Sequence, residues 1–522
     1  MTAADSPEAS PAAATIRLPP GLFLALMVLW SYAYFYNGAK HNQNSRLDAI
    51  YTFVEPGPLQ YTFRIDPWLS DPERGLNTYD WALYEGRYYP NKPPGTLIAG
   101  SIGYWLIYHV ETLMGKDPTS GDAVYINAWL IGFFLGAIPA ALAAPLLLAI
   151  LRGYFGLAHG RAFVVAAALF FGTMVWSHST HLWGHTWVVA CAIAALYCYI
   201  RPGRWWLLGC GTAAASAVLM EYPGVVVPAA FGLLLAGDVA WQILRGRRAR
   251  AKRAMRRLLL FGIGAIGPFI VHAAYHQACF GSWHAAASQF ENQQFLDEGQ
   301  AFGKFGGFSI SKLIDVTFSP YRGLFWISPV LLLAIPGFEL WYRTRRYRRL
   351  WLLCVASIVL HLLMNATFNG WHGGMTVGPR YLIPMLPFAA LGLAWWPWSR
   401  VGRAALIGLT ALSALLVLAV VCVSPLASES REKEANPVYR RLVFFVQGRY
   451  TPSQDMPIRN DPHGLMVNES KELYSAFNVG DMHGFDGHLS LIPWTVLMAL
   501  FGLGYWRSTR PAEPEDEALT CG

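Results

Sequence analysis

The feature that most constrains this chain is a series of apolar segments that contain few or no charged residues. A helix needs roughly 20 apolar residues to cross the hydrocarbon core of a bilayer. Lipid offers no hydrogen-bond partners, so a spanning backbone must be helical or belong to a closed barrel. Candidate spans lie at about 21–37, 124–150, 162–177, 186–200, 205–221, 222–241, 258–276, 323–342, 351–366, 381–398, 404–424 and 489–506. We therefore expect an all-α integral membrane protein with about 12 transmembrane helices and interfacial helices in a large first outer loop.

Composition supports this class and argues against a soluble protein. Hydrophobic residues make up 54% of the 522 residues and charged residues only 14%, whereas soluble domains carry about a quarter charged residues. The net charge of +8 does not indicate binding to nucleic acid, because the basic residues cluster between the apolar segments. The seven cysteines form no CxxC pair and are interpreted as packing residues. We therefore expect the chain to interact with the lipid bilayer and not with nucleic acid.

The positions of the basic residues predict the topology, since Lys and Arg mark the cytoplasmic ends of spans. Eight Lys and Arg residues lie between Arg245 and Arg257, and five lie between Arg343 and Arg349. With 12 crossings, both clusters fall on the cytoplasmic side, together with the N- and C-termini. This arrangement requires that segment 95–113 does not cross the membrane but lies in the outer interface.

The same topology divides the chain into regions. Residues 1–20 are expected to form a disordered cytoplasmic tail, 21–506 one membrane domain, and 507–522 a second cytoplasmic tail. The outer loops are predicted at 38–123, 178–185, 277–322, 367–380 and 425–488. Long ordered loops on a rigid scaffold often carry function, so the chemistry is expected in these loops.

Several motifs in these loops resemble those of the C-type glycosyltransferase superfamily (GT-C). They are the large first outer loop with GRYYPNKPPG from Gly86 to Gly95, GTMVWSHSTHLWGH from Gly172 to His185, and the later SPYRGLF and GWHGGMTVGPRYLIPMLP. The resemblance covers most of residues 20–400 and is close to the bacterial branch that includes protein O-mannosyltransferases and the lipid A aminoarabinose transferase.

The resemblance implies an inverting enzyme on the outer face of the bacterial inner membrane. Such an enzyme moves a hexosyl or pentosyl group from a polyprenyl-phosphate donor to a cell-envelope acceptor, which is a lipid, a glycan or a protein. The acceptor hydroxyl needs a carboxylate to take its proton. The leaving phosphate needs fixed cations near the membrane surface.

For the base, relatives begin the first outer loop with an acidic pair followed by Thr-Arg, where this chain has QNSR at 43–46. Asp48, one turn further along a short amphipathic helix, is the nearest carboxylate and the first candidate. Asp80 and Asp66 are the alternatives. Asp48 is also interpretable as an ion-pair partner of Arg46 or as a helix cap.

The donor phosphate is expected to bind Lys92, Arg380, Arg322 and His185. Lys92 matches the lysine that contacts the donor phosphate in relatives, and Arg380 follows a glycine-rich run that lets the backbone approach a ligand. Snorkelling of the lysine to the interface and anchoring of helix ends by the arginines remain the alternative interpretations.

The sugar or acceptor is expected to contact Tyr88, Tyr89, Trp371 and Glu221. Sugar CH faces stack on aromatic rings, but an aromatic belt at the membrane interface would explain the same rings.

A metal site is a further possibility. His178, His181 and His185 recur on one face of a helix end, and Glu221 lies on the same predicted side. Asn91 stands where relatives have the acidic residue before the lysine. No cofactor is predicted with certainty, and a divalent metal remains possible.

Two other classes of function remain open. A lipid-linked sugar flippase or other transporter would place charged or broken helices near the midplane, and most charges here lie at the ends of spans. A non-catalytic scaffold would present the outer loops to partners. Release of polyprenol phosphate distinguishes an enzyme from both.

Overall fold

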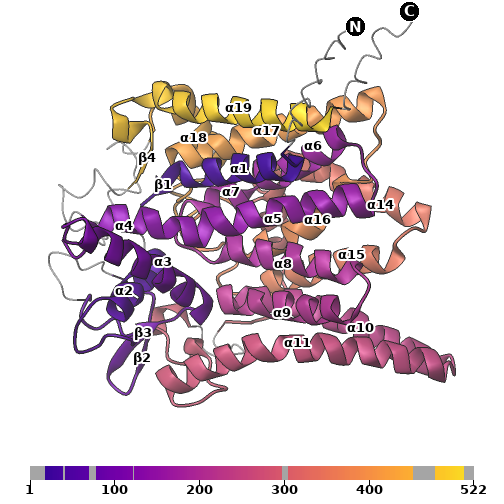
Figure 1. The fold of residues 1–522 in the computed structure, drawn as a ribbon, viewed down its shortest axis with the longest axis horizontal. Coiled ribbons are helices and arrows are strands. Elements are labelled where there is room, and N and C mark those ends of the chain that lie inside the picture. The colour runs from indigo at the N-terminus through magenta and orange to yellow at the C-terminus, as the bar shows by residue number, and fades with distance from the viewer. Residues whose placement is uncertain are drawn as a thin grey trace, which may run out of the picture.

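The structure is a computed structural model that describes residues 18–38, 41–69, 78–120, 123–296, 304–450 and 476–510 (Figure 1). The predicted tails at 1–20 and 507–522 therefore lie largely outside the described residues. The last described helix continues to Thr509, past the predicted end of the membrane domain.

The described chain is almost entirely helical. Its α-helices are α1 (Pro20–Ala33), α2 (His41–Val54), α3 (Pro94–Leu113), α4 (Ala123–Gly132), α5 (Ile138–Ala149), α6 (His159–Phe170), α7 (Met174–Ser179), α8 (His185–Ile200), α9 (Arg204–Met220), α10 (Val226–Leu244), α11 (Arg248–Phe280), α12 (Ile310–Thr317), α13 (Leu324–Ile327), α14 (Ala334–Thr344), α15 (Arg348–Thr367), α16 (Leu386–Leu393), α17 (Arg400–Val423), α18 (Pro437–Val446) and α19 (Ile492–Thr509).

Short helices of other types and four strands complete the fold. The π-helices are η1 (Phe133–Ala137) and η2 (Ile150–Tyr154), and the 3₁₀ helices are η3 (Tyr222–Val225), η4 (Ala287–Gln289), η5 (Gln293–Phe295), η6 (Pro329–Leu333), η7 (Arg380–Met385), η9 (Asp481–His483) and η10 (Gly487–Leu491). The strands are β1 (Phe35–Asn37), β2 (Trp81–Tyr84), β3 (Arg87–Pro90) and β4 (Ala476–Asn478).

The all-α membrane architecture is confirmed, and the predicted spans fall on helices. Within the described residues, six helices are long and apolar enough to cross a membrane: 126–154, 222–244, 248–280, 348–367, 400–423 and 487–509. Four shorter apolar helices coincide with the predicted spans that begin near residues 21, 162, 186 and 381. The span predicted at 205–221 is α9, and the span at 323–342 is broken into α13, η6 and α14.

The long helices lie side by side, and the loops separate into two ends (Figure 1). One end carries α2, α3 and the strands, and the other carries the turns from α10 to α11 and from α14 to α15. The basic clusters at Arg245–Arg257 and Arg343–Arg349 lie in these two turns and in the adjoining ends of α11, α14 and α15. Both clusters therefore lie toward the end opposite α2, as the charge pattern predicts for a multi-pass membrane protein.

Helix α3 fits the interfacial role predicted for segment 95–113. It has 20 residues but is not one of the six apolar helices suited to span. It packs on α2 and α4 at the loop end, while Ile102, Trp105 and Leu113 remain exposed.

Helix α2 differs from the amphipathic helix predicted from the sequence. Nearly every side chain along it is buried, including the polar Gln43, Asn44 and Arg46. A helix that is buried on all sides needs internal partners for its polar groups. Gln43 Nε2 donates to Tyr36 Oη at 2.7 Å, and Arg46 enters a network described below.

Candidate active site

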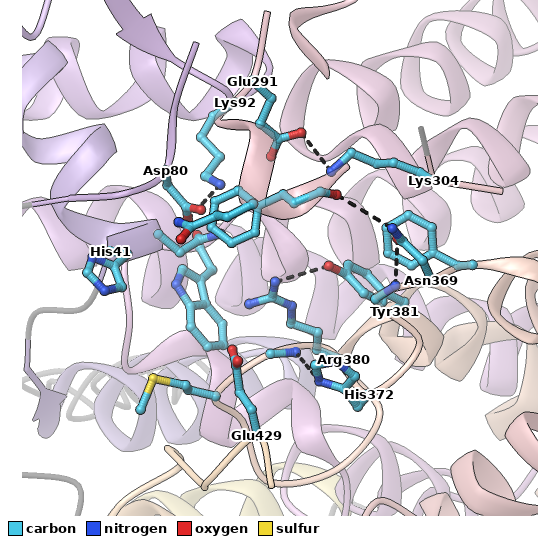
Figure 2. Close-up of a pocket in the computed structure, with 18 residues that line it drawn as sticks. His41, Asp80, Lys92, Glu291, Lys304, Asn369, His372, Arg380, Tyr381 and Glu429 are labelled. Atoms are coloured by element: carbon cyan, nitrogen blue, oxygen red, sulfur yellow. Dashed lines mark hydrogen bonds and ion pairs between the residues drawn. The ribbon is translucent and has the colours of Figure 1, made fainter. Parts of the chain in front are cut away.

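Two cavities open at the loop end and share one wall. The polar cavity has a volume of about 490 Å³ and contains side chains of Asp80, His372 and Glu429 (Figure 2). The apolar cavity, of about 510 Å³, lies between η3, α11 and α15. We call the shared wall the junction; its residues are Asn42, Lys92, Glu291, Lys304, Phe368, Arg380 and Tyr381.

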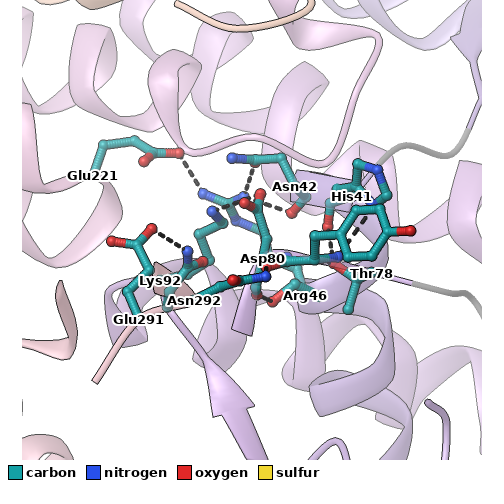
Figure 3. A network of polar contacts seen from close by, with 12 residues as sticks. His41, Asn42, Arg46, Thr78, Asp80, Lys92, Glu221, Glu291 and Asn292 are labelled. Carbon is teal, nitrogen blue, oxygen red and sulfur yellow. Dashed lines mark hydrogen bonds and ion pairs between the residues drawn. The ribbon is translucent and has the colours of Figure 1, made fainter. Parts of the chain in front are cut away.

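The first charged pair of the junction is fixed by a β-hairpin. Strands β2 and β3 pair antiparallel with Trp81 opposite Pro90, which brings the start of β2 next to the end of β3. Asp80 directly precedes this pairing and Lys92 follows it, so their side chains meet. Lys92 Nζ lies 2.8 Å from Asp80 Oδ2 (Figure 3). Both side chains are largely buried.

Lys92 is held at its position by the start of α3. Pro94 occupies the first turn, where the missing N–H of proline costs no hydrogen bond. A Cβ on the next residue, Gly95, would come 2.5 Å from the carbonyl oxygen of Leu219, so only glycine allows this contact with the end of α9.

The second pair comes from the loop between α11 and α12. Glu291 forms an isolated bridge with Ala82, so the loop lies along the edge of β2. Lys304 Nζ lies 2.6 Å from Glu291 Oε2, and Asn91 Nδ2 donates to Glu291 Oε1 at 2.5 Å. Asn91 thus binds the carboxylate of a distant loop.

Arg380 is the third cation of the junction. Its guanidinium lies over the rings of Trp183 and Tyr381, with the central carbon 5.2 and 5.0 Å from the ring centroids. One terminal nitrogen donates to Tyr381 Oη at 3.1 Å. Among the described residues no carboxylate lies within ion-pair distance of Arg380, and its Nε has no hydrogen-bond partner. Its charge is therefore available to an anionic ligand at the junction.

The two carboxylates of the junction differ electrostatically. Burial alone would raise the pKa of the Asp80 carboxyl, but Lys92, Arg380 and His41 hold that pKa below its usual value. Burial raises the pKa of the Glu291 carboxyl, although Lys304 and Lys92 oppose this effect. Asp80 is therefore ionised at neutral pH, and Glu291 takes up a proton more readily than an exposed glutamate.

Behind the junction, Arg46 and Glu221 form a buried pair that joins four helices. Arg46 Nη2 lies 2.5 Å from Glu221 Oε1, and Arg46 Nε donates to Thr96 Oγ1 at 3.0 Å (Figure 3). Glu221 also accepts from the backbone N–H of Gly184 at 2.9 Å. A side chain on Gly184 would collide with the carbonyl of Met220. Glu221 lines the apolar cavity, but its main contacts hold α2, α3, α8 and α9 together.

The remaining predicted carboxylates lie away from the cavities. Asp48 is fully buried on α2 and lines neither cavity. Asp66 accepts from Arg64 Nε at 3.0 Å and from the Tyr88 N–H at 3.1 Å, so it organises the hairpin. Of the three candidate bases, only Asp80 lies in the polar cavity.

Of the residues predicted to bind the donor phosphate, three line a cavity and one does not. Lys92 and Arg380 lie at the junction, and His185 lines the apolar cavity beside it. Arg322 is fully buried and donates to the carbonyl oxygens of Thr376, Gly374 and Ser428.

The three predicted aromatic contacts lie outside both cavities. Tyr88 packs edge-on against Trp81, Tyr89 belongs to the core of the hairpin region, and Trp371 packs against the main core. Trp183 and Tyr381 supply the rings in the polar cavity.

The histidines do not assemble into a metal site. No group of three or more His, Cys, Asp or Glu side chains among the described residues is placed to hold a metal ion. His178 Nε2 instead makes a hydrogen bond with Thr376 Oγ1 at 2.8 Å, and the rings of His178 and His185 meet edge to face at 5.9 Å.

Five further His, Glu and Lys residues of the polar cavity were not predicted from the sequence: His41, Glu291, Lys304, His372 and Glu429. Each lies in a segment predicted to be an outer loop or directly beside a glycine-rich turn. The loop placement was the available signal, but nothing in the sequence distinguished these residues from their polar neighbours.

Comparison with known proteins gives similarity at the level of structure. No family model matches the sequence, and no curated protein sequence matches it. The structure of ArnT from Cupriavidus metallidurans bound to undecaprenyl phosphate is similar at a TM-score of 0.46 and 16% identity, covering 94% of this chain and 75% of that chain. The same protein in the apo state gives a TM-score of 0.42 at the same identity and coverage.

An oligosaccharyltransferase from Archaeoglobus fulgidus gives a TM-score of 0.42 at 10% identity, covering 87% of this chain and 60% of that chain. Similarity of this degree assigns no donor, acceptor or residue role to the chain.

Proposed function

We propose that the protein is an inverting membrane glycosyltransferase that takes a sugar from a polyprenyl-phosphate donor. The observation that carries this proposal is the junction itself, where a polar cavity and an apolar cavity meet at Lys92, Lys304 and Arg380. A lipid-linked sugar has the same order of parts, because a phosphate separates its apolar chain from its polar ring.

The donor would lie across the junction. Its phosphate would contact Arg380 and the two lysines, its first isoprene units would follow the apolar cavity past His185, and its sugar would enter the polar cavity. Arg380 adds a planar fork suited to phosphate oxygens and has no carboxylate to neutralise it among the described residues. As the glycosidic bond breaks, these cations would stabilise the charge on the leaving phosphate.

Asp80 would act as the base. It is the one predicted candidate in the polar cavity, and its low pKa keeps it ionised and ready to accept the proton of the attacking hydroxyl. Lys92 contacts Asp80 and also faces the phosphate position, so it would fix the separation between base and leaving group. The acceptor would be a hydroxyl of a cell-envelope lipid, glycan or protein, and the sugar a hexose or pentose.

In the same proposal the junction faces the extracytoplasmic side of a bacterial inner membrane, with both termini in the cytoplasm. The support is the placement of both basic clusters at the opposite end of the helix bundle.

The test is donor turnover by the purified protein in lipid nanodiscs. A panel of polyprenyl-phosphate sugars is supplied with a cell-envelope extract, and the release of polyprenyl phosphate is measured. Asp80→Asn is expected to lower turnover by about 10²- to 10⁴-fold, which is the usual contribution of a general base. Asp117→Asn is the matched control, because Asp117 lies in the same outer loop but outside both cavities and away from the hairpin.

Other outcomes discriminate between the alternatives. Full activity in Asp80→Asn with loss in a folded Asp48→Asn variant would move the base to Asp48. Movement of the lipid-linked sugar across the membrane without release of polyprenyl phosphate would identify a flippase and reject the enzyme.

A further inference from the structure

A third cavity, of about 420 Å³, lies at the end of the bundle that carries the basic clusters. Its walls come from α8, α10, α11 and α15, so it is separate from the junction at the loop end. No residue of this cavity has a part in the proposed glycosyl transfer.

The polar wall of this cavity has an excess positive charge. Arg349 Nη2 lies 2.8 Å from Asp238 Oδ1, so these two charges neutralise each other. Arg257 also lines the cavity, with its guanidinium carbon 5.7 Å from the ring centroid of Tyr199. Among the described residues, no carboxylate lies within ion-pair distance of Arg257. One positive charge of the cavity thus lacks an internal counter-ion.

The cavity also has apolar lining residues that face outward. Leu233, Trp241 and Leu352 line the cavity and are 62, 51 and 49% exposed in the chain alone. In a membrane these side chains would lie against acyl chains. The cavity thus combines charged side chains with outward-facing apolar side chains of α10 and α15.

We propose that this cavity binds an anionic phospholipid such as phosphatidylglycerol, with the headgroup phosphate at Arg257 and an acyl chain along Leu233 and Leu352. A free phosphate would leave the apolar wall unused, and a zwitterionic lipid would bring its own positive charge close to Arg257. The basic residues around the cavity, eight between 245 and 257 and five between 343 and 349, would further concentrate anionic lipid there.

The test is lipid binding to the purified, delipidated protein by native mass spectrometry, with phosphatidylglycerol and phosphatidylcholine as probes. The wild type is expected to retain at least one phosphatidylglycerol in preference to phosphatidylcholine. Arg257→Gln is expected to weaken that binding about fivefold, as for the loss of one charge near a membrane surface. Leu352→Trp fills the cavity without a change in charge and is expected to weaken phosphatidylglycerol binding too.

The matched control is Arg253→Gln, which removes an exposed charge from the same helix outside the cavity. Equal losses in Arg253→Gln and Arg257→Gln would mean a diffuse basic surface and overturn the proposal. Equal retention of both lipids by the wild type, or displacement of phosphatidylglycerol by millimolar inorganic phosphate, would also overturn it. The Leu352→Trp and wild-type measurements decide the question even if Arg257→Gln fails to fold.

Discussion

Arg380 and Arg322 lie on either side of the same glycine-rich loop, and their surroundings are opposite. Arg322 is fully buried behind the loop and donates to the carbonyls of Thr376, Gly374 and Ser428. Arg380 lies on the cavity side, stacked on Trp183 and Tyr381, and bonds to one hydroxyl. From the sequence, both were candidates for the same phosphate.

The number of backbone carbonyls around the guanidinium distinguishes a structural arginine from a ligand-binding one. A guanidinium has five N–H donors, and backbone carbonyl oxygens can accept from several of them only where the chain curls around the group. Around Arg322 the chain does so, because positive φ angles at Gly373 and Gly374 turn the loop back on itself. Arg322 therefore fixes the loop, and the loop presents Arg380 to the junction.

The largest expected effect is on catalysis at Arg380. Arg380→Gln is expected to lower donor turnover by about 10²- to 10³-fold, since it removes a fixed charge that would stabilise the leaving phosphate. Arg380→Lys, which keeps the charge but not the planar fork, is the control and should lose less. Turnover is followed as polyprenyl phosphate release. A normal rate in Arg380→Gln would show that Arg380 does not stabilise the leaving phosphate.

The second effect is on stability at Arg322. Arg322→Gln leaves buried carbonyl oxygens without donors and is expected to cost about 3 kcal/mol of folding free energy. The measurement is the melting temperature in detergent, with Arg431→Gln, on the exposed side of the same region, as the control. A stable Arg322→Gln variant that fails to bind donor would show that both arginines serve the ligand.

The smallest effect concerns pH and His372, which lies on the loop between the two arginines. Burial, together with Arg322 and Arg380, lowers the pKa of His372 to about 4. Because the unfolded chain binds the proton more tightly, stability is lost as pH falls from about 6.5 toward 4 and is unaffected at higher pH.

The loss of melting temperature over this pH range is expected to be smaller in His372→Gln than in the wild type. Equal pH profiles of the two proteins would contradict the burial of His372 between the two arginines.

Much of the fold could be predicted because a membrane links local features of the sequence, namely apolar length and basic clusters, to the arrangement of the helices. Apolar length identified the helices, and the basic clusters at Arg245–Arg257 and Arg343–Arg349 predicted that one end of the bundle would carry both. The broken span at 323–342 was not anticipated, because Pro329, at the start of η6, interrupts the helix without a loss of hydropathy.

The site could be predicted only where local structure brings residues together. Asp80 and Lys92 meet through a hairpin with a short turn, and Lys92 was identified from its motif. Glu291 and Lys304 reach the junction from a distant loop, so no local spacing marks them. Asp48 was favoured because it lies near the position of the missing acidic pair, but the rotation of α2 directs that residue into the core.

Strand β1 has a consequence for how the protein is made. Its partner is β4, and beside this pair Trp494 Nε1 donates to Ser31 Oγ at 3.0 Å across 463 residues. The helix that opens the first loop begins directly beyond β1. A nascent chain thus contains all the junction residues before α19, the helix that carries Trp494, has been synthesised. Premature termination near residue 470 would remove β4 and α19 and leave β1 without its partner strand.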